Sequence, residues 1–245
     1  MSTDSKPSSV LQYRPIGFVS SPFKQKFAIP RQPNLVREAK GQVILEKEFA
    51  SRDSLREIET FSHIWLLFHF HATAEQGWTP TVQPPRLGGK TRVGVFASRS
   101  PFRPNAIGMS VVELLDIGEK EGQLVINVAG IDLLDGTPIL DIKPYLPYAD
   151  SIEDAAGGFA ESPPGSEMAV QFSVEAERSL DSLEADYSEL RQFITSILRQ
   201  DPRPAWRVKE QDEKRYGMSL FDLNIKWELT QEAITVISIN KETVS

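Results

Sequence analysis

Short alternations of apolar and polar residues dominate the first 150 positions, and this pattern predicts β-strands. The predicted strands are residues 16–20, 42–45, 64–71, 92–97, 110–115, 123–131 and 139–142. Gly- and Pro-containing turns join them without intervening helices, which favours a barrel or a sandwich. The exception is segment 51–60, where Ser51 as N-cap precedes Leu55 and Ile58 at helical spacing and predicts a short amphipathic helix.

The pattern changes after residue 150. Segment 151–166 is small, acidic and rich in Pro and Gly, which is typical of a linker or an edge loop. Residues 168–174 then alternate like a strand, and segment 180–199 predicts one long amphipathic helix. The apolar positions of that helix, spaced by three and four, are Leu180, Leu183, Tyr187, Leu190, Ile194 and Leu198. The helix breakers Pro202 and Pro204 follow it, and further strands are expected near 224–229 and 233–239.

These elements predict a mainly β chain with two domains. An N-terminal β domain is expected over residues 13–150 and a smaller α+β C-terminal domain over residues 167–240, with 151–166 as the linker. The first twelve residues are rich in Ser, Lys and Pro, and we expect them to be disordered.

The composition narrows the class of protein. Of the 245 residues, 40% are hydrophobic and 25% are charged, which is enough apolar material for a sizeable core. We expect no membrane span, because no run approaches the roughly 18–20 apolar residues that crossing a bilayer needs. The chain contains no cysteine, which excludes disulfides and thiolate chemistry, and its polar N-terminus shows no secretory signal. A cytoplasmic location is therefore expected.

The charge is divided unequally along the chain. The formal net charge is −7, yet the first 110 residues carry 15 basic and 8 acidic side chains, and the remaining 135 carry 12 and 26. This division, +7 against −14, predicts a basic face on the first half that could meet a polyanion. Chance segregation of charge is the alternative.

Two proline-rich segments concentrate the basic residues. In segment 22–33, Lys24, Lys26 and Arg31 alternate with Phe23 and Phe27, a pattern suited to phosphate contacts beside base stacking. The alternative is a solvated loop with both aromatic rings turned inward.

The second basic segment extends from residue 84 to residue 105. Its cations are Arg86, Lys90, Arg92, Arg99 and Arg103. Gly88-Gly89-Lys90 lacks the spacing of a phosphate-binding loop, so it carries no such inference. Cations presented on a proline-stiffened backbone still favour an anionic ligand over a purely solubilising surface.

The three histidines, His63, His69 and His71, fall within nine residues and share one face of the predicted strand. A three-histidine metal face is geometrically allowed. We favour the other interpretation, in which these histidines lie among aromatic core residues as hydrogen-bonded polar groups, and no metal is predicted.

An acidic turn supplies a third group of candidate residues. Asp132, Asp135 and Asp141 lie near Lys143 and Tyr145, and offer a general base or a carboxylate that binds a cation. The Asp135-Gly dipeptide is also a common tight-turn signal, so a structural role is the alternative. The residues alone do not identify a reaction.

Several motifs resemble a known family. They are residues 27–33 (FAIPRQP), 61–65 (FSHIW), 84–89 (PPRLGG), 94–105 (GVFASRSPFRPN) and 135–138 (DGTP). These motifs resemble those of the TsaA-like, TrmO-type tRNA (adenine(37)-N6)-methyltransferases. The resemblance extends from about residue 13 to residue 148 and continues at 200–205 and 221–222.

The resemblance implies an S-adenosylmethionine-dependent enzyme whose N-terminal domain is a β-barrel that binds the cofactor. Its substrate would be tRNA carrying N6-threonylcarbamoyladenosine at position 37 of the anticodon loop, methylated on the same N6, and the enzyme would be a homodimer. The cofactor-binding residues implied by the resemblance are Pro30, Arg31, Gln32, His63, Ile64, Arg99, Asp132, Leu133, Leu134 and Asp135.

Methyl transfer to N6 also requires that a proton leave this nitrogen, and Asp135 or Tyr145 is expected to take it or to order a water that does so. Because the cofactor has one carboxylate, the remaining cations are expected to contact RNA phosphates. These are Lys24, Lys26, Arg86, Lys90 and Arg103. Two other classes remain open at this point, a non-catalytic tRNA-binding adaptor and a histidine-metal hydrolase.

Overall fold

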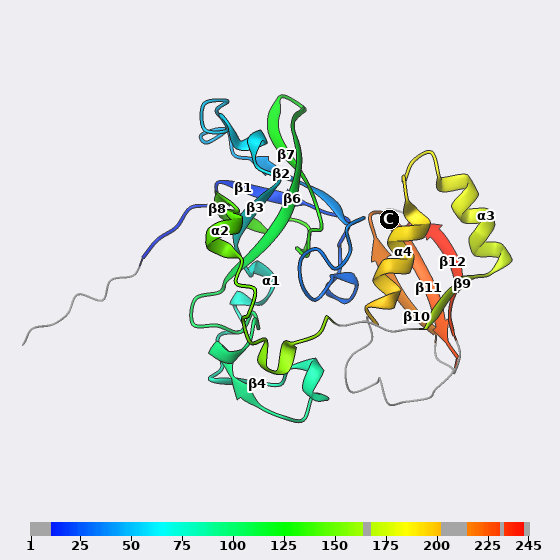
Figure 1. Cartoon of the computed structure of the whole chain (residues 1–245). Coiled ribbons are helices and arrows are strands. Elements are labelled where there is room, and N and C mark those ends of the chain that lie inside the picture. The colour runs from blue at the N-terminus through cyan, green and yellow to red at the C-terminus, as the bar shows by residue number, and fades with distance from the viewer. Residues whose placement is uncertain (1–10, 164–167, 202–214, 231–232, 243–245) are drawn as a thin grey trace, which may run out of the picture.

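The computed structural model describes residues 11–163, 168–201, 215–230 and 233–242. A β-rich N-terminal unit and a smaller α+β C-terminal unit lie side by side (Figure 1). The prediction of a mainly β chain is confirmed. Most of the predicted disordered N-terminus, residues 164–166 of the predicted linker, and Pro202 and Pro204 lie outside the described residues.

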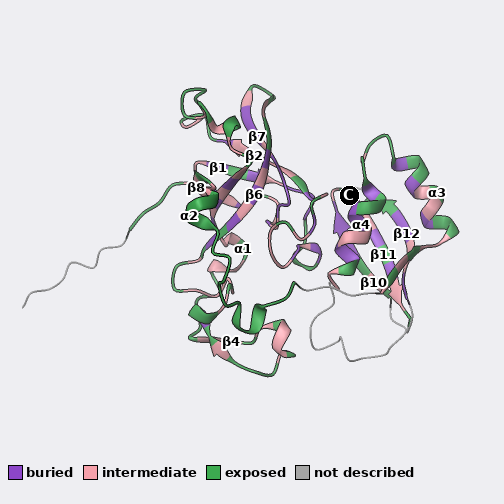
Figure 2. Ribbon diagram, viewed as in Figure 1, coloured by how far each residue is buried: buried purple, intermediate pink, exposed green. Residues whose placement is uncertain are grey.

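Six antiparallel strands of the N-terminal unit close into a barrel. In pairing order they are β1 (Gly17–Ser20), β2 (Lys40–Leu45), β7 (Gln123–Ala129), β6 (Ile107–Lys120), β3 (His63–His69) and β8 (Pro138–Pro144), and β8 pairs again with β1. The alternation predicted from the sequence is visible in β3, where Ile64, Leu66 and Phe68 are buried and the residues between them are half-exposed. Buried residues, coloured purple in Figure 2, lie along the strands of the closed sheet.

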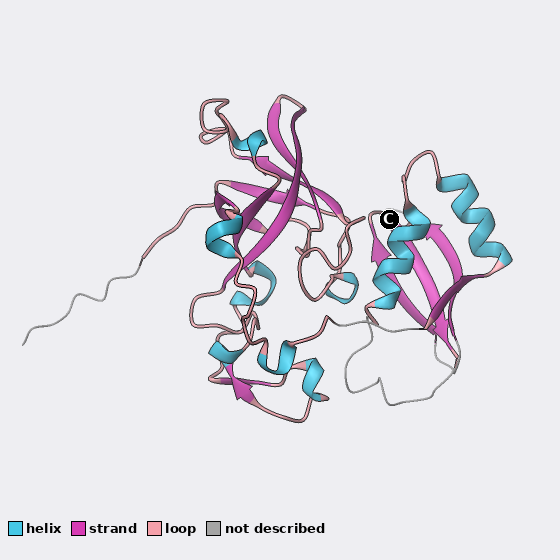
Figure 3. Cartoon of the chain, in the orientation of Figure 1, coloured by secondary structure: helices cyan, strands magenta, loops and turns pink. Residues whose placement is uncertain are grey.

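Short elements connect these strands or follow the last of them (Figure 3). They are η1 (Lys26–Ala28), η2 (Ile58–Thr60), α1 (His71–Ala74), β4 (Thr81–Val82), η3 (Pro85–Leu87), β5 (Val93–Gly94), η4 (Val95–Ala97), α2 (Pro147–Asp150) and η5 (Gly158–Ala160).

Three predicted elements in this part of the chain differ from the structure. The helix predicted over 51–60 is wrong: the segment forms turns that end in η2, because Glu57 adopts a left-handed φ of 69° that no continuous helix permits. The strand predicted over 92–97 is reduced to β5 and continues as η4. The strand predicted over 64–71 ends at His69, and α1 begins at His71.

The C-terminal unit is a four-stranded sheet packed against two helices. The strand order is β10 (Arg215–Leu220), β11 (Leu223–Leu229), β12 (Ala233–Lys241) and β9 (Ala169–Phe172), with β9 parallel to β12. The helices are α3 (Val174–Leu183) and α4 (Leu190–Arg199).

The single helix predicted over 180–199 is therefore wrong, although its apolar positions Leu180, Leu183, Leu190, Ile194 and Leu198 are buried as expected. Glu189 has a left-handed φ of 61° and interrupts the helix before α4. The strand predicted over 168–174 is shortened to β9, since the Ser173 hydroxyl caps α3 by accepting the Ala176 N–H. Strand β10 was not predicted.

The two units share one continuous core. Phe23, in the loop after β1, is fully buried, and its ring lies 6.0 Å from that of Phe193 in α4. The backbone of Phe23 pairs with Leu220 at the end of β10, and the next N–H, that of Phe221, donates to the Pro22 carbonyl at 2.8 Å. The loop that contains η1 therefore lies between the barrel and the C-terminal unit (Figure 1).

Candidate functional site

A cavity of about 430 Å³ opens beside the barrel where four separate segments meet. Its walls are the loop from Lys26 to Pro33, the end of β3 with the start of α1, the loop from Ser98 to Arg103 with the start of β6, and the turn from Asp132 to Thr137. Pairing of β3 with both β6 and β8 brings the last three of these segments together, and the loop from Lys26 joins them although it lies about 100 residues before the Asp132 turn. The volume suits a small-molecule ligand or cofactor.

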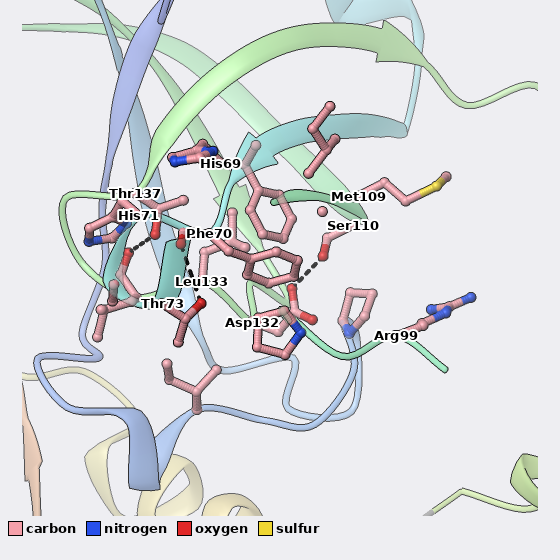
Figure 4. Close-up of a pocket in the computed structure, with 18 of the residues that line it drawn as sticks. His69, Phe70, His71, Thr73, Arg99, Met109, Ser110, Asp132, Leu133 and Thr137 are labelled. Atoms are coloured by element: carbon pink, nitrogen blue, oxygen red, sulfur yellow. Dashed lines mark hydrogen bonds between the residues drawn. The ribbon is translucent and has the colours of Figure 1, made fainter. Parts of the chain in front are cut away.

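The centre of the cavity is apolar. The rings of Phe68 and Phe70 pack edge to face with 5.0 Å between their centroids. Leu133 is buried and lies near Phe70 (Figure 4). Gly108 allows this packing, because a Cβ at that position would lie 2.3 Å from the Phe68 ring. This surface can receive a flat heterocycle or an aliphatic chain.

One end of the cavity presents charges of both signs. The Ser110 hydroxyl donates to the Asp132 carboxylate at 2.7 Å, and the side chains of Arg99 and Met109 lie at the same end (Figure 4). The Arg99 guanidinium donates to the Gln32 side-chain carbonyl at 2.6 Å. A zwitterionic group could therefore find a cation and an anion here.

Burial makes Asp132 an unusual acid. Desolvation raises the pKa of Asp132 to about 6, against the opposing effects of the Ser110 hydrogen bond, a backbone hydrogen bond and the positive charge of Arg99. Asp132 is therefore ionised at neutral pH, but in surroundings that do not stabilise its charge fully. A raised carboxyl pKa inside a cavity is a common mark of a functional site.

The opposite end carries His69, His71 and Thr73 (Figure 4), with Lys26 from η1. The Lys26 ammonium donates to the Ala72 carbonyl at 3.3 Å. Desolvation lowers the pKa of His71, electrostatic interactions with His69 and Lys26 lower it further, and a hydrogen bond with the His69 backbone partly opposes them. His71 is therefore neutral at pH 7.

Arg103 organises the loop that carries Arg99. Its guanidinium donates to the carbonyls of Val95 at 3.2 Å and Ser98 at 2.7 Å. The Ser98 hydroxyl also donates to the Val95 carbonyl, at 2.8 Å. These bonds hold the turn just before Arg99 and so orient the backbone at Arg99 in the cavity wall.

The acidic turn is bonded to the loop after β1. The Ser21 hydroxyl donates to the Leu133 carbonyl at 2.8 Å, and the Ser21 N–H donates to the Asp135 carboxylate at 2.9 Å. The other oxygen of that carboxylate forms an ion pair with Lys24 at 2.7 Å. Gly136 follows with a φ of 73°, which a residue with a side chain rarely adopts, and its N–H donates to the Val19 carbonyl.

Seven of the ten residues implied as cofactor-binding line this cavity. They are Pro30, Arg31, Gln32, Arg99, Asp132, Leu133 and Leu134. His63, Ile64 and Asp135 do not line it, and neither does Tyr145.

The residues outside the cavity have identifiable positions. His63 lies at the other end of β3, six residues or about 20 Å of extended chain from His69, with its ring centroid 6.3 Å from that of Tyr145. Ile64 is fully buried in the barrel. The Asp135 carboxylate is held by Ser21 and Lys24, as described above.

Several cavity residues were not among the predicted site residues. They are His69, Phe70, His71, Thr73, Met109 and Ser110. The clustering of all three histidines was a usable signal, but strand parity could not tell which end of the strand faces a ligand. Met109 and Ser110 are ordinary strand residues, and nothing in the sequence marks them.

The structure places the cations predicted to contact RNA in the cavity wall, in an ion pair, or away from the cavity. Lys26 and Arg103 line the cavity, whereas Lys24 forms the ion pair with Asp135. Arg86 donates to the Ser162 carbonyl, and Lys90 is exposed.

The three-histidine face does not form. His63 and His69 lie at opposite ends of β3, and His71 belongs to α1. Within the described parts of the chain, no group of three or more His, Asp or Glu side chains could hold a metal ion. In the same parts, the helices are too short and too polar to span a membrane.

Comparisons with known proteins show the family to which this chain is similar. The family model for the tRNA-methyltransferase O N-terminal domain matches residues 18–151, and the model for the TrmO C-terminal domain matches residues 165–242. A tRNA (adenine(37)-N6)-methyltransferase of Escherichia coli K12 is 48% identical over 231 residues, which cover 94% of this chain and 98% of that protein. A putative S-adenosylmethionine-dependent methyltransferase of Pseudomonas aeruginosa PAO1 is 47% identical over 87% of this chain and 90% of its own.

A solved structure shows the same fold. The crystal structure of TrmO from Pseudomonas aeruginosa superposes with a TM-score of 0.78 at 38% identity, covering 95% of this chain and 99% of that one.

Proposed function

The chain belongs to the tRNA-methyltransferase O family, and from this membership we propose the reaction that its cavity supports. It is an S-adenosylmethionine-dependent tRNA methyltransferase that transfers a methyl group to N6 of the adenosine at position 37, in the N6-threonylcarbamoyl form. The observation that carries the proposal is a cavity with an apolar centre, opposite charges at one end and a surplus of cations around it.

The cavity residues fit the proposed cofactor. Arg99 offers a guanidinium to the methionine carboxylate, and Asp132 offers a carboxylate to the methionine ammonium. Phe68, Phe70 and Leu133 offer the apolar surface that the adenosine and the methylene chain need. When bound, S-adenosylmethionine supplies an activated methyl group on a sulfonium.

The contribution of the protein is mainly positional. In-line displacement would form the bond between N6 and the methyl carbon while the bond between carbon and sulfur breaks, with the neutral thioether as the leaving group and the N6 proton passing to solvent. No nucleophilic side chain is required, so holding both reactants in line supplies most of the rate enhancement. Asp135 and Tyr145 lie outside the cavity, and therefore we propose no proton-acceptor role for them.

We further propose that the chain acts in the cytoplasm as a homodimer on the anticodon loop of tRNA. Large apolar side chains exposed near the cavity mouth support a partner surface there. Phe96 is 76% exposed, Met109 is 55% exposed and Ile107 is 38% exposed, although Met109 and Ile107 also line the cavity.

The proposed reaction is tested by mass spectrometry of tRNA nucleosides from cells with and without the gene. The N6-methylated form of threonylcarbamoyladenosine should disappear in the deletion strain and return when the gene is restored. An unchanged nucleoside profile would contradict the proposal. Binding of labelled S-adenosylmethionine to the purified chain separates the enzyme from a non-catalytic adaptor.

We expect tRNA binding to depend on salt in spite of the net charge of −7. Lys26, Arg86 and Lys90 form no ion pair with a described carboxylate, so three cations remain available to phosphates. With three contacts to single-stranded RNA, affinity should fall about 20-fold between 50 and 200 mM salt. Filter binding at several salt concentrations measures the slope, and a flat response would show that these cations do not form a phosphate-binding face.

Lys90 and Arg103 should respond differently to substitution by alanine. Lys90→Ala should weaken tRNA binding and leave cofactor affinity unchanged, because Lys90 is exposed outside the cavity. Arg103→Ala should weaken cofactor binding as well, because the bonds to Val95 and Ser98 that order the Arg99 loop are lost. Separate cofactor and tRNA titrations measure both effects. Loss of cofactor binding in Lys90→Ala with normal tRNA affinity would reverse this assignment.

A further inference from the structure

The loop between β1 and β2 links the C-terminal unit to the cavity. At its start, Phe23 is fully buried against Phe193 of α4, and its backbone pairs with Leu220. The Phe221 N–H donates to the Pro22 carbonyl at 2.8 Å. Three residues after Phe23, the same loop reaches the cavity wall at Lys26, and it lines the cavity again from Ile29 to Pro33.

A second contact from the C-terminal unit lies at the cavity wall itself. The Arg31 guanidinium donates to the Asp201 carbonyl at 3.2 Å. Asp201 follows the C-terminal end of α4 with a left-handed φ of 49°, and the last carbonyls of a helix carry a partial negative charge that favours a cation. The next residue, Gln32, accepts the hydrogen bond from Arg99. A continuous path of contacts therefore joins α4 to Arg99.

Between these two contacts the loop packs against α4 only in part, although Ala28 is buried and Ile29 lies against the core. A hollow of about 150 Å³ separates it from α4, lined by the loop from Lys26 to Arg31 on one side and by Ile197 and Gln200 on the other. Pro30 and Arg31 line both this hollow and the main cavity, so a single layer of chain divides the two. The position of that layer then depends on the contacts at Phe23 and Arg31 together with the buried Ala28.

We propose that the C-terminal unit is part of the cofactor site, because α4 and the turn between β10 and β11 hold the loop that presents Arg31 and Gln32. Phe23 and Phe193 are then positioning residues for cofactor binding, although neither of them lines the cavity. This inference rests on the proposed function, since it assumes that the main cavity holds the cofactor. The competing view is that the C-terminal unit serves only tRNA binding or overall stability.

The test compares two equal substitutions in the full chain. Phe193→Leu removes part of the ring that supports Phe23, and the matched control Phe172→Leu makes the same change in β9, where the ring lies 4.8 Å from Arg191. We expect Phe193→Leu to weaken S-adenosylmethionine binding about tenfold, as displacement of a site loop by a fraction of an ångström does. Phe172→Leu should leave that affinity unchanged. Calorimetric titration measures both variants at a temperature where circular dichroism shows them folded.

A double substitution distinguishes positioning from general stability. If Phe193 acts through Arg31, adding Phe193→Leu to Arg31→Ala should cost much less affinity than adding it to the wild type. A purely structural role predicts the same additional loss in both backgrounds. Where Phe193→Leu does not fold, Phe221→Leu replaces it, because Phe221 packs 5.8 Å from Phe193 in the same cluster.

The wild-type titration separates the two proposals. If the wild type does not bind S-adenosylmethionine, the proposed function fails. If the wild type binds it and Phe193→Leu binds it equally well, the proposed function stands and the positioning role is overturned.

Discussion

Asp132→Asn is expected to stabilise the chain by about 3 kcal/mol at pH 8 while removing most of its affinity for the cofactor. In the folded chain the pKa of Asp132 is about 6, against an ordinary value of 3.8. The folded state therefore holds this proton more tightly than the unfolded state. Stability must fall as the pH rises from about 4 to about 6, and the loss persists above pH 6.

The asparagine carries no charge to desolvate, and its side-chain oxygen can still accept the Ser110 hydrogen bond. The stability gain should thus be full at pH 8 and should fall close to zero at pH 3, where aspartate is mostly protonated in both states. Urea unfolding at the two pH values measures it. Asp116→Asn, at an exposed carboxylate that accepts a bond from Asn127 on the barrel surface, is the matched control. Equal stability of Asp132→Asn and wild type at pH 8 would show that burial does not penalise this charge.

The loss of affinity follows from the same carboxylate. Without it, the cofactor ammonium meets a neutral amide in a partly desolvated site, and leaving a charged group without its partner costs several kcal/mol. Calorimetric titration at pH 8 should show a dissociation constant at least roughly 100-fold larger than that of the wild type, equivalent to a loss of about 2.7 kcal/mol of binding free energy. Binding at wild-type strength would remove Asp132 from the cofactor site. A charge that costs stability and provides affinity is an expected compromise at a functional site.

Arg99→Ala is expected to weaken cofactor binding by roughly 10- to 150-fold, which corresponds to the 1.5–3 kcal/mol of a typical charge-assisted hydrogen bond. In the structure the Arg99 guanidinium bonds to Gln32 across the cavity wall, so its loss also releases the loop that carries Gln32. Stability should change little, because Arg99 is exposed.

Arg14→Ala is the control for this substitution. Arg14 is exposed and pairs with Glu48, and it does not line the cavity, so its removal should leave cofactor affinity as in the wild type. Arg99→Lys adds a finer comparison, since lysine keeps the charge but cannot make the planar two-point contact with a carboxylate. Wild-type calorimetric affinity in Arg99→Ala would exclude Arg99 from the site.

The sequence by itself determined most of the strands and the apolar sides of the helices. Alternation with period two and spacing of three or four are local properties, and they survive any tertiary arrangement that buries one face. The buried positions of β3 and of α4 follow directly from them. The family resemblance likewise implied Pro30, Arg31, Gln32, Arg99 and the residues from Asp132 to Leu134, all of which line the cavity.

Only the tertiary structure decided where the predicted helix over 180–199 divides and where the strand predicted over 64–71 ends. Glu189 adopts a left-handed conformation, which cannot be predicted from its residue type. Helix α1 begins at His71, although the alternation of the sequence continues through that residue.

Tertiary structure also decided which predicted residues meet. His63 and His69 have the same parity on one strand, so no local pattern distinguishes them. Closure of the barrel places the end of β3 that carries His69 beside the Asp132 turn and leaves His63 beside Tyr145. The ion pair of the Asp135 carboxylate was also beyond any local pattern, because its partner Lys24 is more than 100 residues away in the chain. A cavity forms where the ends of distant strands meet, and such contacts between distant segments have no counterpart in local periodicity.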